Sequence, residues 1–332
     1  MRNLIECAMQ NQSVRLLAVR GNAKNIRRKE FFLIVKDDIS IMEEGLKSDR
    51  KISTARKEFN EMIGLSSAKT IINKTIASFK LKKVCMYKGV RKENLSLHMV
   101  FTGNPGTAKT TVARLFAEIM KDEKVLQSGN FVEAGRADLV GDHVGATASL
   151  VKKKFKEVQG GVLFIDEAYS LCDNYENGFG DEAINTLAQE MENHRDDVIV
   201  IFAGYPDQMK QFLERNPGMA SRIAFHVEFE DYSADKLCDI TKLMLSRKQM
   251  IITDAAMEKL KNIYESVRDD KDFGNGRFVR KILEEAEMNL AERIVQLDES
   301  KLTKKLITTI EERDIPESDL NKQYKKKQIG FA

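Results

Sequence analysis

The chain has 332 residues, which is long enough to bury a sizeable core and suits two domains or one domain with a lid. Apolar residues make up 42% of it and charged residues 32%, which excludes a membrane-spanning or disordered chain and indicates a soluble globular protein. The formal net charge of +3 is too small to indicate nucleic-acid binding by itself.

The four cysteines are scattered along the chain without a C-x-x-C pair, at Cys7, Cys85, Cys172 and Cys238. This pattern favours reduced thiols in a cytoplasmic protein over a disulfide framework or a metal site. The N-terminus lacks the long apolar region of a secretory signal, and no segment is long enough to span a bilayer.

Residues 1–52 form the least informative segment, and we assign no role to them. Two apolar runs, at residues 13–20 and 31–35, are typical of short strands, and a basic stretch at residues 27–29 separates them. We interpret that stretch as solvated surface, because a short charge run is weak evidence of a binding patch.

Apolar residues recur at helical spacing from residue 54 to residue 79. A turn around Ile63 and Gly64 divides this pattern, and Ser66 or Ser67 is predicted to cap the second helix. A short apolar turn just before a phosphate-binding loop can enclose an adenine ring, but a plain turn between two helices is equally consistent with these residues.

Residues 97–111, LHMVFTGNPGTAKTT, begin as an apolar strand, continue into a loop with glycine and proline, and open a helix. A phosphate-binding loop requires this order, because backbone N–H groups of the loop and the helix N-terminus bind anionic oxygens. We predict that Lys109 reaches the β- and γ-phosphates of ATP and that Thr110 places its hydroxyl on Mg²⁺. The residues predicted to bind nucleotide here are Gly103, Asn104, Pro105, Gly106, Thr107, Ala108, Lys109, Thr110 and Thr111.

Ala108 departs from the pattern G-x-x-x-x-G-K-[ST], in which a glycine precedes the lysine. If this position has a positive φ, the alanine costs roughly 1–2 kcal/mol. If the position is already helical, the alanine costs nothing, and the sequence leaves both alternatives open.

Residues 131–134 are predicted to form a second buried strand. After it, Gly141 and Gly145 flank a loop that contains His143 and leads into a basic helix. A loop with glycines at both ends can move, but His143 is most simply interpreted as a surface residue.

Four apolar residues at 162–165 end in Asp166 and Glu167, a pattern that predicts a buried parallel strand with two carboxylates at its carboxyl end. We predict that Asp166 holds Mg²⁺, directly or through water. Glu167 is predicted to orient and polarise the attacking water.

A further buried strand is predicted at residues 197–205 and ends in Tyr205, which we expect near the γ-phosphate, between the acidic strand and the phosphate-binding loop. Arg222 lies in the loop before a fifth strand at residues 224–229. Because loop arginines are usually solvated, Arg222 alone carries little evidence of function.

From residue 232 onward the pattern is all-helical. Ser233 and Thr253 are predicted to cap two helices, and residues 274–277 open a third. Arg277 lies in the first turn of that helix, where a cation is unfavourable to the helix dipole, and this suggests a partner such as a phosphate.

Five motifs follow one another along the chain: GNPGTAKTTVAR, GGVLFIDEAYSL, VIFAGYPDQM, NPGMASRI and GNGRFVRK. In this order and spacing they resemble the AAA+ ATPases of the CbbX and stage V sporulation protein K type. The resemblance extends from about residue 54 to about residue 319 and leaves residues 1–52 unexplained.

The resemblance implies an α/β fold, a P-loop NTPase αβα sandwich with a five-stranded parallel sheet, followed by a small all-helical lid. It predicts a nucleotide-binding domain at residues 53–231, a lid at residues 232–320 and a basic tail at residues 321–332. It also implies ATP and Mg²⁺ as cofactors and a homo-oligomeric ring, usually a hexamer, with ATP between neighbouring chains.

The resemblance also assigns roles to single residues. Lys109 and Thr110 match Walker A, and Asp166 and Glu167 match Walker B. Arg222 matches the arginine finger that reaches the γ-phosphate bound by the next subunit.

Three further assignments follow from the same resemblance. Arg277 matches the sensor arginine of the lid, and Ile63 and Gly64 match the adenine turn. Tyr205 stands at the sensor-1 position, where many AAA proteins carry asparagine. His143 replaces the aromatic residue that family pore loops use to hold polypeptide, and an imidazole offers less apolar contact than a tyrosine ring.

The main hypothesis is therefore a ring-forming, protein-remodelling ATPase that acts on a protein client. The alternative is a nucleotide-gated assembly scaffold with weak or no hydrolysis, which Ala108 and His143 motivate. A third hypothesis, a nucleic-acid-associated AAA+ protein, depends only on the basic runs at residues 27–29 and 325–327. Sporulation, Rubisco activation and secretion are all compatible with this core.

Overall fold

The computed structural model describes residues 53–87, 96–143, 145–172, 178–268, 273–298 and 302–317. The chain divides into two units, Met1–Ser53 and Thr54–Ala332, and the fold described here is that of the second unit. The strands predicted at residues 13–20 and 31–35 and the basic runs at residues 27–29 and 325–327 lie outside the described residues.

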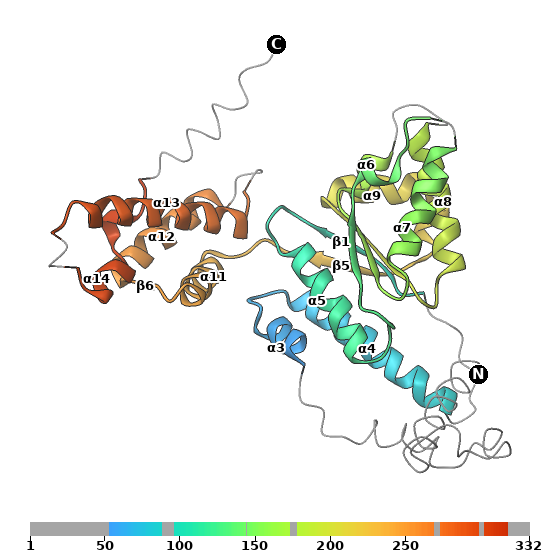
Figure 1. The fold of residues 1–332 in the computed structure, drawn as a ribbon, viewed down its shortest axis with the longest axis horizontal. Helices are drawn as coiled ribbons and strands as arrows, with labels where there is room; N and C mark the ends of the chain where they lie inside the picture. The colour runs from blue at the N-terminus through green and yellow to red at the C-terminus, as the bar shows by residue number, and fades with distance from the viewer. Residues whose placement is uncertain are drawn as a thin grey trace, which may run out of the picture. The chain divides into compact units, whose positions relative to one another are not determined.

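A five-stranded parallel sheet forms the centre of the first part of this unit (Figure 1), as the sequence predicts. The strands lie in the order β2-β3-β4-β1-β5. Since β1 lies between β4 and β5, the loop that follows it leaves the sheet at an interior position, where ligands of open α/β sheets bind. The strands are β1 (His98–Gly103), β2 (Phe131–Ala134), β3 (Val162–Ile165), β4 (Ile199–Gly204) and β5 (Ile223–Phe229).

Helices cover both faces of this sheet because successive side chains of a strand point to opposite faces. Met99 and Phe101 of β1 pack into one apolar cluster with α4 and α5, whereas Val100 packs into a second cluster with α7 and α8. Figure 1 shows these two helical layers on either side of the strands. The helices of this region are α3 (Thr54–Glu61), α4 (Ser66–Tyr87), α5 (Lys109–Asp122), α6 (Arg136–Leu139), α7 (Ala146–Glu157), η3 (Ala168–Leu171), α8 (Phe179–Asn193), α9 (Pro206–Arg215) and α10 (Pro217–Ala220).

Two local predictions are wrong. Strand β2 is not buried throughout, because it lies at the edge of the sheet and only Ala134 of its four residues is buried. Neither Ser66 nor Ser67 caps α4, because the helix already begins at Ser66. Leu65 precedes it with φ +60°, and its carbonyl accepts the first helical hydrogen bond from Lys69 N–H at 2.8 Å.

The lid is helical, as predicted, and its first two helices begin at the predicted caps. Ser233 Oγ accepts a hydrogen bond from Lys236 N–H, and Thr253 Oγ1 accepts one from Ala256 N–H. A two-residue parallel pair, β6 (Ile251–Ile252) with β7 (Thr309–Ile310), adds to the helices. These are α11 (Ala234–Arg247), α12 (Asp254–Val267), α13 (Gly276–Val295), α14 (Lys304–Thr308) and η5 (Glu312–Asp314).

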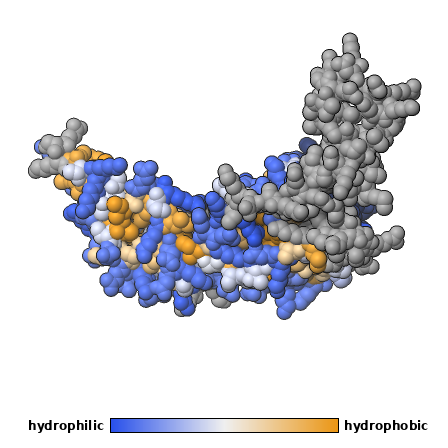
Figure 2. Space-filling model, turned by 90° about the horizontal axis from the view of Figure 1, so that it is seen from below, coloured by the Kyte–Doolittle hydropathy of each residue, from blue (hydrophilic) through white to orange (hydrophobic). Residues whose placement is uncertain are grey.

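The surface seen in Figure 2 is mostly hydrophilic, with smaller hydrophobic areas between the charged residues. Large apolar side chains that stay exposed include Met288 and Val295 of the lid, which are 65% and 83% accessible. Among the described helices, none has the length and apolar character needed to cross a membrane.

Candidate functional site

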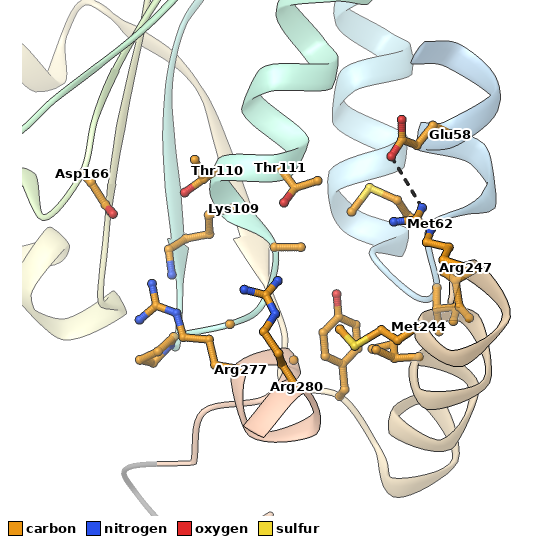
Figure 3. A pocket seen from close by; sticks show the side chains of 18 of the residues that line it. Glu58, Met62, Lys109, Thr110, Thr111, Asp166, Met244, Arg247, Arg277 and Arg280 are labelled. Carbon is orange, nitrogen blue, oxygen red and sulfur yellow. Dashed lines mark ion pairs between the residues drawn. The ribbon is translucent and has the colours of Figure 1, made fainter. Parts of the chain in front are cut away.

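A pocket of about 450 Å³ lies where the loop after β1, the segment before α4 and the lid meet (Figure 3). Its walls come from four places: the loop and start of α5, the carboxyl ends of β3 and β4, the end of α3, and helices α11 and α13. The predicted site residues that line it are Ile63, Pro105, Gly106, Ala108, Lys109, Thr110, Thr111, Asp166, Glu167, Tyr205 and Arg277.

The loop between β1 and α5 has a backbone that only glycine tolerates at two places. At Gly103 a Cβ would lie 2.5 Å from the Phe229 carbonyl oxygen, and at Gly106, with φ +72°, it would collide with the Gly274 carbonyl oxygen of the lid. Thr107 is fully buried, and its hydroxyl donates to the Asn104 carbonyl at 2.8 Å. The loop is therefore held in shape from inside, and Pro105, Gly106 and Ala108 of it line the pocket.

Ala108 has φ +73° and ψ +21°, which is the left-handed region. This answers the question that the sequence leaves open: the alanine occupies a position that favours glycine, at a cost of roughly 1–2 kcal/mol. Its carbonyl nevertheless accepts the first hydrogen bond of α5 from Val112 N–H at 2.9 Å, so the helix begins as a phosphate-binding loop requires.

Lys109 is half-buried, and its Nζ donates to the carbonyls of Gly103 at 2.7 Å and Asn104 at 2.9 Å. Burial lowers the pKa of Lys109 most, the charge of Arg277 lowers it further, and Asp166 opposes both effects. The ammonium group is thus held at the loop, with a carboxylate and a second cation within electrostatic reach.

Asp166 and Glu167 follow β3, and both are exposed to the pocket. Glu167 has φ +49° and ψ +45°, and its N–H donates to Asp166 Oδ1 at 3.1 Å. A non-glycine residue with this backbone is uncommon and is often associated with a functional site. This turn therefore holds two neighbouring carboxylates at the edge of the pocket.

Tyr205 follows β4, which lies between β3 and β1, so it stands between the acidic turn and the phosphate-binding loop as predicted. Its ring lies 6.0 Å from that of Tyr169, measured between centroids. Burial, followed by the charge of Glu167, raises the pKa of Tyr169 to about 12. Tyr169 therefore stays a neutral hydroxyl beside the carboxylates at ordinary pH.

The opposite end of the pocket is mostly apolar, and the ion pair between Arg247 and Glu58 lies beside its apolar side chains (Figure 3). Ile63 lines it, whereas Gly64, with φ +67°, faces Tyr232, whose Cε1 would lie 3.3 Å from a Cβ at that position. This end also contains side chains that the sequence did not assign to the site, namely Met62, Tyr232, Ile240, Leu243 and Met244. Most of these residues show helical spacing in the sequence, but apolar periodicity alone does not distinguish residues that line a pocket from residues of the core.

The lid contacts the phosphate-binding loop directly through the turn before α13. Gly276 N–H donates to the Gly106 carbonyl at 3.1 Å. Asn275 is fully buried, accepts a hydrogen bond from Tyr232 N–H at 2.9 Å and donates to Asp231 Oδ1 at 2.7 Å and to the Pro105 carbonyl at 3.3 Å. Its φ of +46° and ψ of −120° are unusual for a residue with a side chain.

The structure does not bring Arg222 to this pocket. Arg222 precedes β5, at the amino edge of the sheet, and β5 extends over seven residues before it reaches the pocket edge. Its Nη1 donates to the Gly218 carbonyl at 2.6 Å, and its Nε lies 3.8 Å from Glu192 Oε2. His143 is exposed and also lies outside the pocket lining.

Comparison with known families gives two matches that follow one another along the chain. Residues 99–230 match the ATPase family associated with various cellular activities (AAA). Residues 233–325 match the AAA lid domain. The first match covers the sheet and the phosphate-binding loop, and the second covers the helices that close the pocket.

Curated relatives match over most of their own length. The chain is 43% identical over 262 residues to the chloroplastic ribulose bisphosphate carboxylase/oxygenase activase of Cyanidioschyzon merolae. The aligned residues cover 78% of this chain and 89% of that protein. This chain is 41% identical over 257 residues to protein CbbX of Cereibacter sphaeroides, covering 77% and 83% of the two chains. It is 38% identical over 262 residues to stage V sporulation protein K of Bacillus subtilis, covering 78% and 81%.

Among solved structures, the FIGL-1 AAA domain in complex with ADP matches with a TM-score of 0.54 and 17% sequence identity. The match covers 82% of this chain and 90% of that chain. At this identity the similarity establishes the fold alone.

Proposed function

The chain belongs to the AAA ATPase family, and we propose that it binds ATP in the pocket under the lid and hydrolyses it to ADP and phosphate. The observation that carries this proposal is the meeting of Lys109, Thr110, Asp166 and Arg277 around one cavity. The loop N–H groups and Lys109 would bind the phosphates, and Glu167 would orient the attacking water.

Mg²⁺ fits the residues at the metal end of this pocket. The Thr110 hydroxyl and the Asp166 carboxylate are hard oxygen ligands, and both line the cavity. Within the described residues, no group of three or more His, Cys, Asp or Glu is placed to share an ion. Mg²⁺ suits such a sparse set, because it usually combines one or two carboxylates with phosphate oxygens and waters. When bound, it would neutralise phosphate charge.

The proposal assigns Arg222 to the pocket of a neighbouring chain in a homo-oligomeric ring, of six subunits by analogy with the family. Arg222 lies at the sheet edge opposite its own pocket, which supports a contact between chains rather than within one. Tyr205 and Arg277 would contact the terminal phosphates from the same chain.

We infer that hydrolysis remodels a protein client. The support is similarity to a relative whose name describes an activase of another enzyme. The domain boundaries at residues 53, 232 and 320 and a cytoplasmic location belong to the same proposal. They follow from the family resemblance and from the scattered cysteines.

Glu167→Gln tests the catalytic assignment most sharply. The amide keeps the shape of the side chain but removes the charge that polarises water, so ATP should still bind while phosphate release falls by a hundredfold or more. The matched control is Glu157→Gln at the end of α7, which is exposed and outside the pocket. Turnover that stays unchanged in Glu167→Gln would refute this role.

A nucleotide-gated assembly scaffold is the second candidate, and the left-handed Ala108 favours it. A strained residue directly before Lys109 can hold the loop in a form that binds nucleotide but turns over slowly. Assembly in ATP without measurable phosphate release would select this function over the first.

A further inference from the structure

A second arginine of α13, Arg280, lines the pocket beside Arg277. Its side chain is exposed, and it has no hydrogen-bond or ion-pair partner within the part of the chain that the structure describes. Arg247, another arginine of the lid at this pocket, is different, because its Nη2 lies 3.6 Å from Glu58 Oε1. The pocket therefore contains a guanidinium group whose charge nothing in the described structure neutralises.

Arg280 lies one helical turn after Arg277, so both side chains leave the same face of α13. Figure 3 shows both of them extending from this helix toward the beginning of α5. In this view Arg277 lies beside Lys109, and Arg280 lies between Arg277 and Met244. The two arginines thus occupy successive places along the pocket.

The chemistry of the pocket walls indicates which part of a nucleotide would lie beside each arginine. Lys109, Thr110 and Asp166 make one end suited to the terminal phosphates, whereas Ile63 and Met244 belong to the apolar end that suits a base. The charge of Arg277 acts on the pKa of Lys109, which fits its place at the phosphate end. A nucleotide that spans the pocket has its α-phosphate and ribose between these two ends.

We propose that Arg280 binds the α-phosphate and ribose of the bound nucleotide, so that it holds ATP and ADP equally, whereas Arg277 acts on the terminal phosphates. This inference rests on the proposed nucleotide site and assigns the two arginines to different phosphates within it. The α-phosphate is present in both nucleotides, and a guanidinium group suits its oxygens because it donates two parallel hydrogen bonds.

The different contacts of the two arginines affect how the lid responds to hydrolysis. After hydrolysis the contact made by Arg277 would change with the loss of the γ-phosphate, but the contact made by Arg280 would remain. Arg280 would therefore keep α13 on the product, and it would slow the release of ADP.

The experiment measures dissociation constants for ATP and ADP by calorimetry in a Glu167→Gln background, which limits hydrolysis during the titration. Arg280→Gln should weaken both nucleotides by about tenfold and leave the ratio of the two constants unchanged. Arg277→Gln should weaken ATP more than ADP and so change that ratio. Lys281→Gln is the matched control, because it removes a charge from the next position of α13 outside the pocket lining.

Two outcomes would overturn the assignment. Unchanged affinity in Arg280→Gln would show that the side chain does not contact nucleotide, and a loss confined to ATP would move it to the terminal phosphates. Arg280→Lys, which keeps the charge without the planar fork, should recover only part of the affinity. If the background protein without these changes binds neither nucleotide, the proposed function itself fails, and the two failures are thus distinguishable.

Discussion

The two edges of the central sheet differ in what they hold. The carboxyl edge carries the phosphate-binding loop, the acidic turn and Tyr205, and the lid supplies a further wall of the same pocket. The amino edge carries Arg222, held by the Gly218 carbonyl and near Glu192 of its own chain. With seven residues in β5, the edges lie roughly 20 Å apart. One chain therefore has the pocket in which we propose that nucleotide binds, but it cannot bring its own Arg222 to that pocket.

The largest expected effect, on the rate of phosphate release, comes from removing Arg222 at the amino edge. Arg222→Ala should lower the rate of phosphate release roughly 10³- to 10⁵-fold, as loss of a trans-acting arginine does in other nucleotide hydrolases. The dissociation constant for ATP should stay within about twofold, because the pocket of the same chain is intact. Turnover and calorimetric binding on one preparation measure both.

Mixing two inactive variants tests whether the edges belong to different chains. Lys109→Ala damages the carboxyl edge only, and Arg222→Ala damages the amino edge only. A mixture should regain turnover, since an intact pocket can meet an intact Arg222 of a neighbour. Mixed assemblies that form but stay inactive would contradict the account.

A second test concerns His98, which is buried at the amino edge. His98 Nδ1 accepts from Val200 N–H at 3.0 Å, and its Nε2 bonds the Met191 carbonyl at 3.2 Å. Burial first, with Arg222 adding to it and Glu192 opposing it, lowers the pKa of His98 to about 4. Neutral, buried His98 therefore contributes to the stability of the folded protein. Because its folded pKa lies below the unfolded value of 6.5, this contribution is fully present above pH 6.5 and is lost as the pH falls toward 4.

The expected loss in the free energy of unfolding between pH 6.5 and pH 4 is about 3 kcal/mol from this one group. Denaturant unfolding at a series of pH values measures it. His98→Gln should be less stable at pH 7 but should show a shallower dependence on pH. An equal dependence in both proteins would exclude His98 as the source.

A third and smaller effect concerns the contact between lid and loop at the carboxyl edge. Asn275→Ala removes the acceptor of the buried Tyr232 N–H and keeps the strained backbone, so it should cost about 2 kcal/mol. Hydrogen exchange of the Tyr232 amide should become faster. Asn275→Gly relieves the backbone strain but loses the same hydrogen bonds. A smaller loss of stability in Asn275→Gly than in Asn275→Ala would therefore separate the contribution of the strain from that of the hydrogen bonds.

The smallest effect is expected at Ala108. Ala108→Gly removes the left-handed strain and should raise the free energy of unfolding by about 1 kcal/mol, after the greater freedom of glycine in the unfolded chain is included. Ala291→Gly on the exposed side of α13 is the control and should be destabilising by about 1 kcal/mol. A loss of stability in both variants would exclude strain at position 108.

Sequence patterns predicted the parts of this fold that depend on short runs. The strand at Val162–Ile165 has the predicted bounds, because four buried apolar residues between a glycine pair and two carboxylates define both ends. Ser233 and Thr253 cap their helices, because capping is a local hydrogen bond that needs no tertiary partner.

Other features depend on contacts that no short run contains. The φ of Ala108 is set by the loop around it, and the edge position of β2 is set by the strand order. Asn275 looked like an ordinary turn residue, because its partners Tyr232 and Asp231 lie more than 40 residues earlier in the chain. Arg280 has the same helical spacing as any exposed arginine, and only the pocket distinguishes it.

The central claim is that ATP hydrolysis in this chain is completed by a neighbour. The most direct measurement is the rate of phosphate release per chain at increasing protein concentration, with the assembly state followed by sedimentation in the same buffer. The account predicts that the rate per chain rises with concentration and reaches a plateau as assemblies form. A constant rate at concentrations where the chains sediment as monomers would contradict it.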